Sequence, residues 1–140
     1  MSKILHYIKE GLCYLLAIFM VLAGINHFTN TTPYISMVPN ILPWHTFIVY
    51  GSGIVEIMVG IMLFFKGRIR IFGALLIFMM MLIFFPIHII DLFRETPSIS
   101  GFVPANKNVY EFAIVRVIMQ CILILWTYLV YRYIKKTIKY

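Results

Sequence analysis

Charged residues are scarce in this chain of 140 residues, and acidic residues are the scarcest of them. Lys, Arg, Asp and Glu make up 12% of the sequence, whereas hydrophobic residues make up 62%. A soluble domain carries about 25% charged and roughly half apolar residues, so this composition excludes an ordinary soluble protein and indicates a membrane protein. At about 20 apolar residues per span, the length allows four membrane-crossing helices and leaves no room for a separate soluble domain.

Cysteine is also nearly missing. The sequence holds Cys13 and Cys121, far apart and inside apolar segments, and it contains no Cys-x-x-Cys pair. A redox-active dithiol and a cysteine-based metal site are therefore not expected, and we predict that both thiols pack as small hydrophobic side chains. A Gly-rich phosphate loop, a nucleophile elbow and a paired-carboxylate acid/base site are likewise missing from the sequence.

What is present is a set of long apolar segments. Their expected bounds as helices are 8–28, 45–65, 69–93 and 109–131. Lipid offers the backbone no hydrogen-bond partners, so segments this apolar must be helical. The predicted fold class is an all-α polytopic membrane protein, one domain over residues 1–140 built as a four-transmembrane-helix bundle. The stretch 29–43 holds three prolines, and we expect it to be a loop without regular helix.

The basic residues predict an orientation. The net charge is +7, but Lys and Arg flank the apolar segments, which fits membrane topology better than nucleic-acid binding. One side of the predicted bundle collects most of them: Lys3, Lys9, Lys66, Arg68, Arg70, Arg132, Lys135, Lys136 and Lys139. The other side has Arg94 and Lys107. Because membrane proteins keep their positive loops inside, both termini are predicted to be cytoplasmic.

Glu56 is the acidic side chain in the middle of the second apolar segment. A carboxylate at bilayer depth costs about 2.5–3.5 kcal/mol unless it is neutralised, hydrated or paired. Arg116 is the basic residue that lies deep in another segment. At 1.5 Å per residue, Glu56 lies about 16 Å below His45 and Arg116 about 10 Å below Val109. We predict an intramembrane ion pair between them, and a register-fixing role without further function stays open.

Small and polar residues surround this predicted pair. Gly53 and Gly60 lie on the same helical face as Glu56, which predicts close approach of another helix. Gln120 lies one turn below Arg116, where its amide would accompany the pair.

Further polar residues gather toward the predicted outer face. Asn26 and His27 end the first segment, and His88 follows Pro86 in the third, one turn from Asp91. We expect Asn26, His27 and His88 to line a cavity together with the predicted pair, although each histidine also fits an interfacial role. No cofactor is predicted, but a bis-His haem between His27 and His88 stays open. Zinc has less support, because no Cys/His cluster at ligand spacing exists.

These residues also carry a family resemblance. The motifs, in chain order, are Ala23-Gly-Ile-Asn-His-Phe28, Met37-Val-Pro39, Ser52-Gly-Ile-Val-Glu-Ile-Met-Val-Gly60, Phe85-Pro86 and Arg116-Val-Ile-Met-Gln120. Over nearly the whole chain they resemble the DoxX-like family of small four-helix membrane proteins. The resemblance implies that Glu56, Arg116 and Gln120 are characteristic polar positions. It departs at His88, where family members often have Asn, and at Val117-Ile118, where they often have Leu-Pro.

The resemblance implies several functions. Family members are associated with quinol oxidase and thiosulfate:quinone oxidoreduction, with oxidative-stress enzymes, or with receptor assembly. We expect a DoxX-like protein of a bacterial inner (plasma) membrane whose Glu/Arg site binds a small or lipidic ligand or a partner membrane protein, rather than an enzyme acting alone. Two alternatives stay open: a quinone-linked oxidoreductase subunit, with quinone at Arg116 or His88, and a membrane-protein assembly chaperone. A homo-oligomer also stays open, and the lipid bilayer is the expected surrounding.

Overall fold

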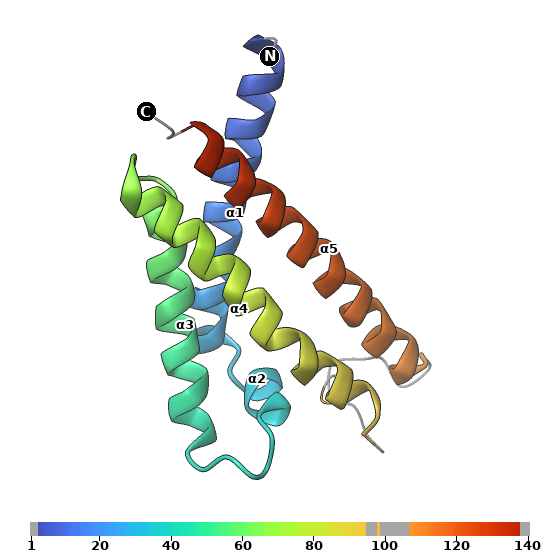
Figure 1. Ribbon diagram of the computed structural model, residues 1–140. Coiled ribbons are helices and arrows are strands. Elements are labelled where there is room, and N and C mark those ends of the chain that lie inside the picture. Colours follow the sequence, from blue (N-terminus) through green and yellow to red (C-terminus); the bar gives the residue numbers. More distant parts are fainter. Residues whose placement is uncertain (1–2, 95–97, 99–106, 138–140) are drawn as a thin grey trace.

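The chain folds into helices, as the computed structural model shows for residues 3–94, 98 and 107–137 (Figure 1). The helices are α1 (Lys3–Thr29), α2 (Thr32–Met37), α3 (His45–Met62), α4 (Arg68–Leu92) and α5 (Val109–Thr137). Four of them, all except α2, are long and apolar enough to cross a membrane. The described residues contain no strand, so the predicted all-α class with four helices of membrane-spanning length is confirmed.

The helix ends differ from their predicted positions. The first and last long helices extend further than the apolar runs at residues 8–28 and 109–131, because α1 begins at Lys3 and α5 continues to Thr137. Hydrophobicity marks the part of a helix that fits the membrane, whereas a helix continues for as long as its backbone hydrogen bonds are satisfied. The predicted C-terminal basic residue Lys139 lies outside the described residues.

The prediction of no regular helix between residues 29 and 43 is wrong. The short helix α2 forms there, with Pro33 in its first turn. A proline is tolerated at that position, because the N–H that it lacks has no partner within the helix anyway. The helix ends at Met37, and its C-cap Val38 has extended backbone directly before Pro39.

α1 and α3 pack at close range through glycines. A Cβ on Gly24 would lie 2.6 Å from the Gly53 carbonyl oxygen, and a Cβ on Gly53 would lie 2.8 Å from the His27 Cβ. Farther along α3, a Cβ on Gly60 would lie 3.0 Å from the Ala17 oxygen. The predicted close approach at Gly53 and Gly60 is therefore confirmed, and its partner is α1.

The hydrophobic core lies toward the end of the bundle that holds both termini. It joins α1, α3, α4 and α5 through the buried side chains of Cys13, Leu16, Ala17, Met20, Val59, Leu63, Ala74, Ile77, Met81, Val130, Tyr133 and Ile134. Cys13 is fully buried, as predicted. The same prediction is wrong for Cys121, which is exposed on the face of α5 that points away from the core.

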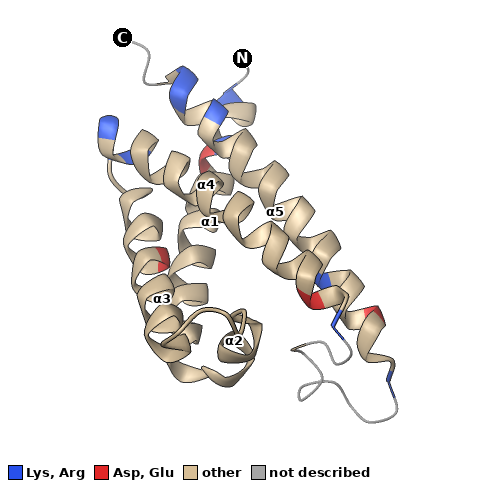
Figure 2. Cartoon of the chain, turned by 60° about the horizontal axis from the view of Figure 1, so that its bottom comes forward, with Lys and Arg blue, Asp and Glu red and all other residues tan. Residues whose placement is uncertain are grey.

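The end of the bundle that holds the termini also carries most of the Lys and Arg residues (Figure 2). One of these residues, Arg70, is buried. Its guanidinium is 2.9 Å from the Glu10 carboxylate and 5.2 Å from the centre of the Tyr14 ring. This pair ties α4 to α1.

At the opposite end, the α1–α3 pair and the α4–α5 pair spread apart, and α2 lies between them (Figure 1). α2 contacts both α3 and α4. This divergence places the candidate site near the α2 end.

Candidate functional site

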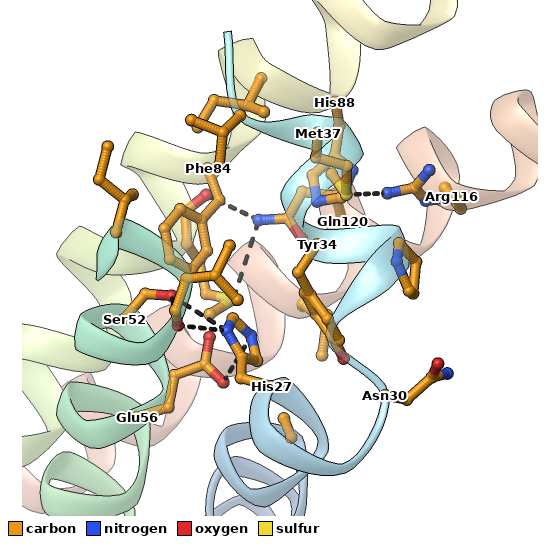
Figure 3. A pocket seen from close by; sticks show the side chains of 18 of the residues that line it. His27, Asn30, Tyr34, Met37, Ser52, Glu56, Phe84, His88, Arg116 and Gln120 are labelled. Atoms are coloured by element: carbon orange, nitrogen blue, oxygen red, sulfur yellow. Dashed lines mark hydrogen bonds and ion pairs between the residues drawn. The ribbon is translucent and has the colours of Figure 1, made fainter. Parts of the chain in front are cut away.

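A cavity of about 570 Å³ lies between the two helix pairs and under α2 (Figure 3). Most of its wall is apolar, formed by side chains such as Phe19, Met20, Phe84 and Leu123. The polar residues in the wall are His27, Asn30, Tyr34, Ser52, Glu56, His88, Arg116 and Gln120. A cavity of this volume, apolar with a few converging polar groups, is typical of small-molecule sites.

Most of the predicted site residues meet here. Glu56, Arg116, Gln120, His27 and His88 all line the cavity. Asn26 is not part of the wall. Its amide donates a 2.7 Å hydrogen bond to the hydroxyl of Tyr34, and Tyr34 lines the cavity.

His27 and Glu56 form the polar corner nearest the α1–α3 contact. The Nε2 atom of His27 is 3.4 Å from Oε2 of Glu56, and both side chains are more than 90% buried. The Nδ1 atom of His27 is 3.0 Å from the Val49 carbonyl oxygen. A carbonyl oxygen only accepts, so we assign the Nδ1 proton to this bond. The Ser52 hydroxyl donates to the same carbonyl at 2.9 Å and lies 3.0 Å from Nδ1.

Tyr34 covers this corner from α2. Its ring centre is 3.8 Å from that of His27. The burial of its hydroxyl raises the pKa of Tyr34 above its ordinary value. Because Asn26 donates to the hydroxyl oxygen, the hydroxyl proton is left to donate elsewhere, and the described residues show no acceptor for it.

Arg116 forms the second polar corner, and its partner is Asp91 rather than Glu56. Its Nη1 donates to Oδ2 of Asp91 at 3.1 Å and to the Ser98 hydroxyl at 3.1 Å. The guanidinium also contacts the Met37 sulfur of α2. Ser98 in turn donates to both carboxylate oxygens of Asp91. The prediction of a direct ion pair between Glu56 and Arg116 is therefore wrong, although both residues face one cavity.

The packing of the helices explains this correction. α5 lies against α4, whereas α3 lies mainly against α1. Glu56 therefore meets a partner on α1, and Arg116 meets one on α4. The long arginine side chain also extends to a carboxylate near the end of α4, so the depth of its Cα did not locate its charge.

Gln120 links α5 to α4 at the cavity wall. It is 4% exposed, and its amide donates a 2.7 Å hydrogen bond to the Met81 carbonyl oxygen. Pro86 removes the helical partner of the neighbouring Leu82 carbonyl, and Gln120 binds one residue away from that position.

His88 presents a free hydrogen-bonding atom to this region. Its Nδ1 is buried and has no hydrogen-bond partner among the described residues. The two nitrogens of His27 both face protein groups, Val49 and Glu56. In this arrangement His27 offers no nitrogen to iron, so the residues do not fit a bis-His haem. The described residues also contain no group of three or more His, Cys, Asp or Glu side chains that could hold a metal ion.

Asp91 and Tyr34 were not among the predicted site residues. Asp91 is 2% exposed and holds Arg116, Arg94 and Ser98 around one carboxylate. Its spacing of one turn from His88 was the sequence signal. Tyr34 carried no such signal, because the segment around it was expected to be a loop.

The fold and the site define a class of protein: a small helical bundle with four helices of membrane-spanning length and an internal cavity bounded by two polar corners. The chain belongs to the family described as domain of unknown function DUF8561, whose model matches residues 16–131. No curated protein and no solved structure matches the chain.

Proposed function

We propose that this chain is a DoxX-like integral protein of a bacterial inner membrane, with both termini in the cytoplasm, that binds a small lipidic ligand in the cavity under α2. The observation that carries the proposal is the cavity itself, about 570 Å³ with an apolar wall and polar groups at two corners. An amphiphile from the bilayer matches this distribution, because its chain fits the wall and its head meets the corners.

Two features of the polar corners support ligand binding over a purely structural role. Nδ1 of His88 is buried without a hydrogen-bond partner among the described residues, and buried Oε2 of Glu56 has only the long 3.4 Å contact with Nε2 of His27. A buried polar group without a partner typically costs about 1–3 kcal/mol. A bound ligand that supplies hydrogen bonds to these atoms would offset that cost.

Ligand retention tests the proposal. The protein would be purified in an uncharged detergent, and the bound masses identified by native mass spectrometry and solvent extraction. Ala23 lines the cavity, so Ala23→Phe should fill it and abolish retention. Val115→Phe is the matched control, because Val115 is 54% exposed on the outside of α5. Equal retention in both variants, or no bound molecule in the wild type after lipids are added, would refute the proposal.

A quinone-linked oxidoreductase subunit is the second candidate. It is favoured by the free Nδ1 of His88, which lies in the same wall as the His27–Glu56 pair. The His88 imidazole would donate a hydrogen bond from Nδ1 to a quinone carbonyl. The His27–Glu56 pair would exchange a proton with the quinone. Co-purified quinone together with quinol-dependent electron transfer that is lost in His88→Leu would favour this function.

A further inference from the structure

The two charged residues of the cavity wall, Arg116 and Glu56, each have a partner. Arg116 is held by Asp91 at 3.1 Å, and Glu56 faces His27 at 3.4 Å. Asp91 and Glu56 are 2% and 5% exposed, so both carboxylates lie away from solvent. In such a site a charge without a partner is strongly disfavoured.

The proton count of the His27–Glu56 pair follows from its hydrogen bonds. Nδ1 of His27 holds a proton for the Val49 carbonyl, so Nε2 is the atom that faces Glu56. If Glu56 were ionised and Nε2 unprotonated, a lone pair would face a buried negative charge. One proton between the two atoms removes this repulsion, whichever atom carries it. The pair is then neutral as a whole.

Arg94 is the remaining cation near the second corner. It lies 3.5 Å from Asp91, but its side chain is 28% exposed, and it is not part of the cavity wall. Its charge is partly exposed, so solvent and salt screen it, and its Nη1 also donates to the Ser36 carbonyl oxygen. Arg116 is the cation in the wall, and Asp91, outside the wall but 3.1 Å from Arg116, balances its charge. His88, also in the wall, is neutral in its ordinary form at pH 7.

Hydrogen-bonding capacity without net charge is what the cavity still offers. Nδ1 of His88 and the hydroxyl proton of Tyr34 have no partner among the described residues. These groups suit a head that both donates and accepts hydrogen bonds, such as a hydroxyl or a glycerol ester.

From this balance, and resting on the proposed ligand-binding function, we infer that the cavity selects an uncharged long-chain amphiphile with a hydroxyl- or ester-bearing head and excludes anionic and cationic lipids. The apolar wall takes the chain, and the partnerless polar atoms take the head. A carboxylate, phosphate or ammonium head would find no free counter-charge.

A competition among three probes of matched chain length tests the inference. Monopalmitoylglycerol, hexadecanesulfonate and hexadecyltrimethylammonium would be offered in equal amounts to the full chain in an uncharged detergent. Native mass spectrometry would then count the bound masses. We expect the glycerol ester to be retained at least about tenfold over either ion, because an uncompensated buried charge is costly.

A charge change at the second corner sharpens the test. Asp91→Asn should leave Arg116 without its carboxylate. The ratio of bound sulfonate to bound glycerol ester should therefore rise by about tenfold or more. Glu111→Gln is the matched control, because Glu111 is an exposed acid on α5 and should leave the preference unchanged. If Asp91→Asn does not fold, the wild-type competition decides alone.

The possible failures are distinguishable. A wild-type protein that retains the sulfonate or the ammonium probe as well as the glycerol ester would overturn the inference but leave ligand binding in place. A wild-type protein that retains none of the three would overturn the proposed function itself.

Discussion

At the scale of single residues, the buried charges around the cavity form two local pairs. His27 with Glu56 joins α1 to α3, and Arg116 with Asp91 joins α5 to α4. Each pair links two neighbouring helices at the cavity, so each has a structural role whether or not a ligand binds. Because the pairs do not contact each other, their contributions to stability should be separable.

A double-mutant cycle measures this separation. We expect Asp91→Asn and Arg116→Gln to show a coupling energy within about 0.5–3 kcal/mol, because the two side chains bond directly. Each single change destabilises the fold, and the double change costs less than the sum. The same cycle with Glu56→Gln and Arg116→Gln should be additive. The measurement is reversible unfolding in mixed micelles, and strong coupling in the second cycle would restore a direct Glu56–Arg116 pair.

Tyr34 gives a pH-dependent prediction. Its raised pKa means that the folded state keeps the phenol proton at a pH where the unfolded chain has lost it. This contribution to stability is complete below the ordinary pKa of about 10 and is lost as the pH rises through the folded value. We expect the wild type to lose more free energy of unfolding than Tyr34→Phe as the pH rises from 9 through the pKa of the folded state. Parallel pH curves for the two proteins would contradict the burial of this hydroxyl.

At the scale of helices, the α1–α3 contact decides where the first polar corner forms. Gly24 and Gly53 let the two backbones meet, and a Cβ on Gly53 would strike His27 itself. The same contact therefore packs the helices and sets His27 against Val49, Ser52 and Glu56. The other side of the corner is supplied by α2 through Tyr34.

Glycine substitutions test this contact with a matched control. Gly24→Ala should destabilise the protein by about 1–3 kcal/mol, because its Cβ would lie 2.6 Å from the Gly53 oxygen. Gly51→Ala, also on a helix of this pair, meets no atom within 4 Å and should stabilise it by up to about 1 kcal/mol. Thermal unfolding in detergent distinguishes the two. Equal shifts would mean that α1 and α3 do not approach as closely as described.

At the scale of the whole molecule, charge and shape divide the bundle into two ends. The end with the termini carries most of the basic residues (Figure 2). It also holds the hydrophobic core, whereas the cavity lies under α2 at the other end. If the proposed orientation holds, the cavity lies toward the outer leaflet and receives its ligand from that side of the membrane.

Single-cysteine labelling tests this orientation in intact cells. Lys66→Cys, in the basic turn, should stay unlabelled by a membrane-impermeant maleimide until the cells are opened. Lys107→Cys, at the opposite end, should be labelled at once. Wild type is the blank, because Cys13 is buried and Cys121 lies within a span. The reverse pattern would place the termini outside.

The sequence by itself determined the number of long helices, their approximate limits and most of the polar residues of the cavity wall. Long apolar segments must be helical in lipid, and a polar side chain within them must turn toward protein or water. Glu56, His27, Arg116 and Gln120 could therefore be identified before their neighbours were known.

Only the tertiary structure decided which of these residues meet. Depth along a helix allowed Glu56 to pair with Arg116, but depth leaves open which helices are adjacent and which way a long side chain extends. Packing through Gly24 and Gly53 sets α1 against α3. The packing of α5 against α4 brings Arg116 to Asp91. The tertiary structure also decided that α2 forms and places Tyr34 over His27, because a short helix of this kind depends on its tertiary contacts.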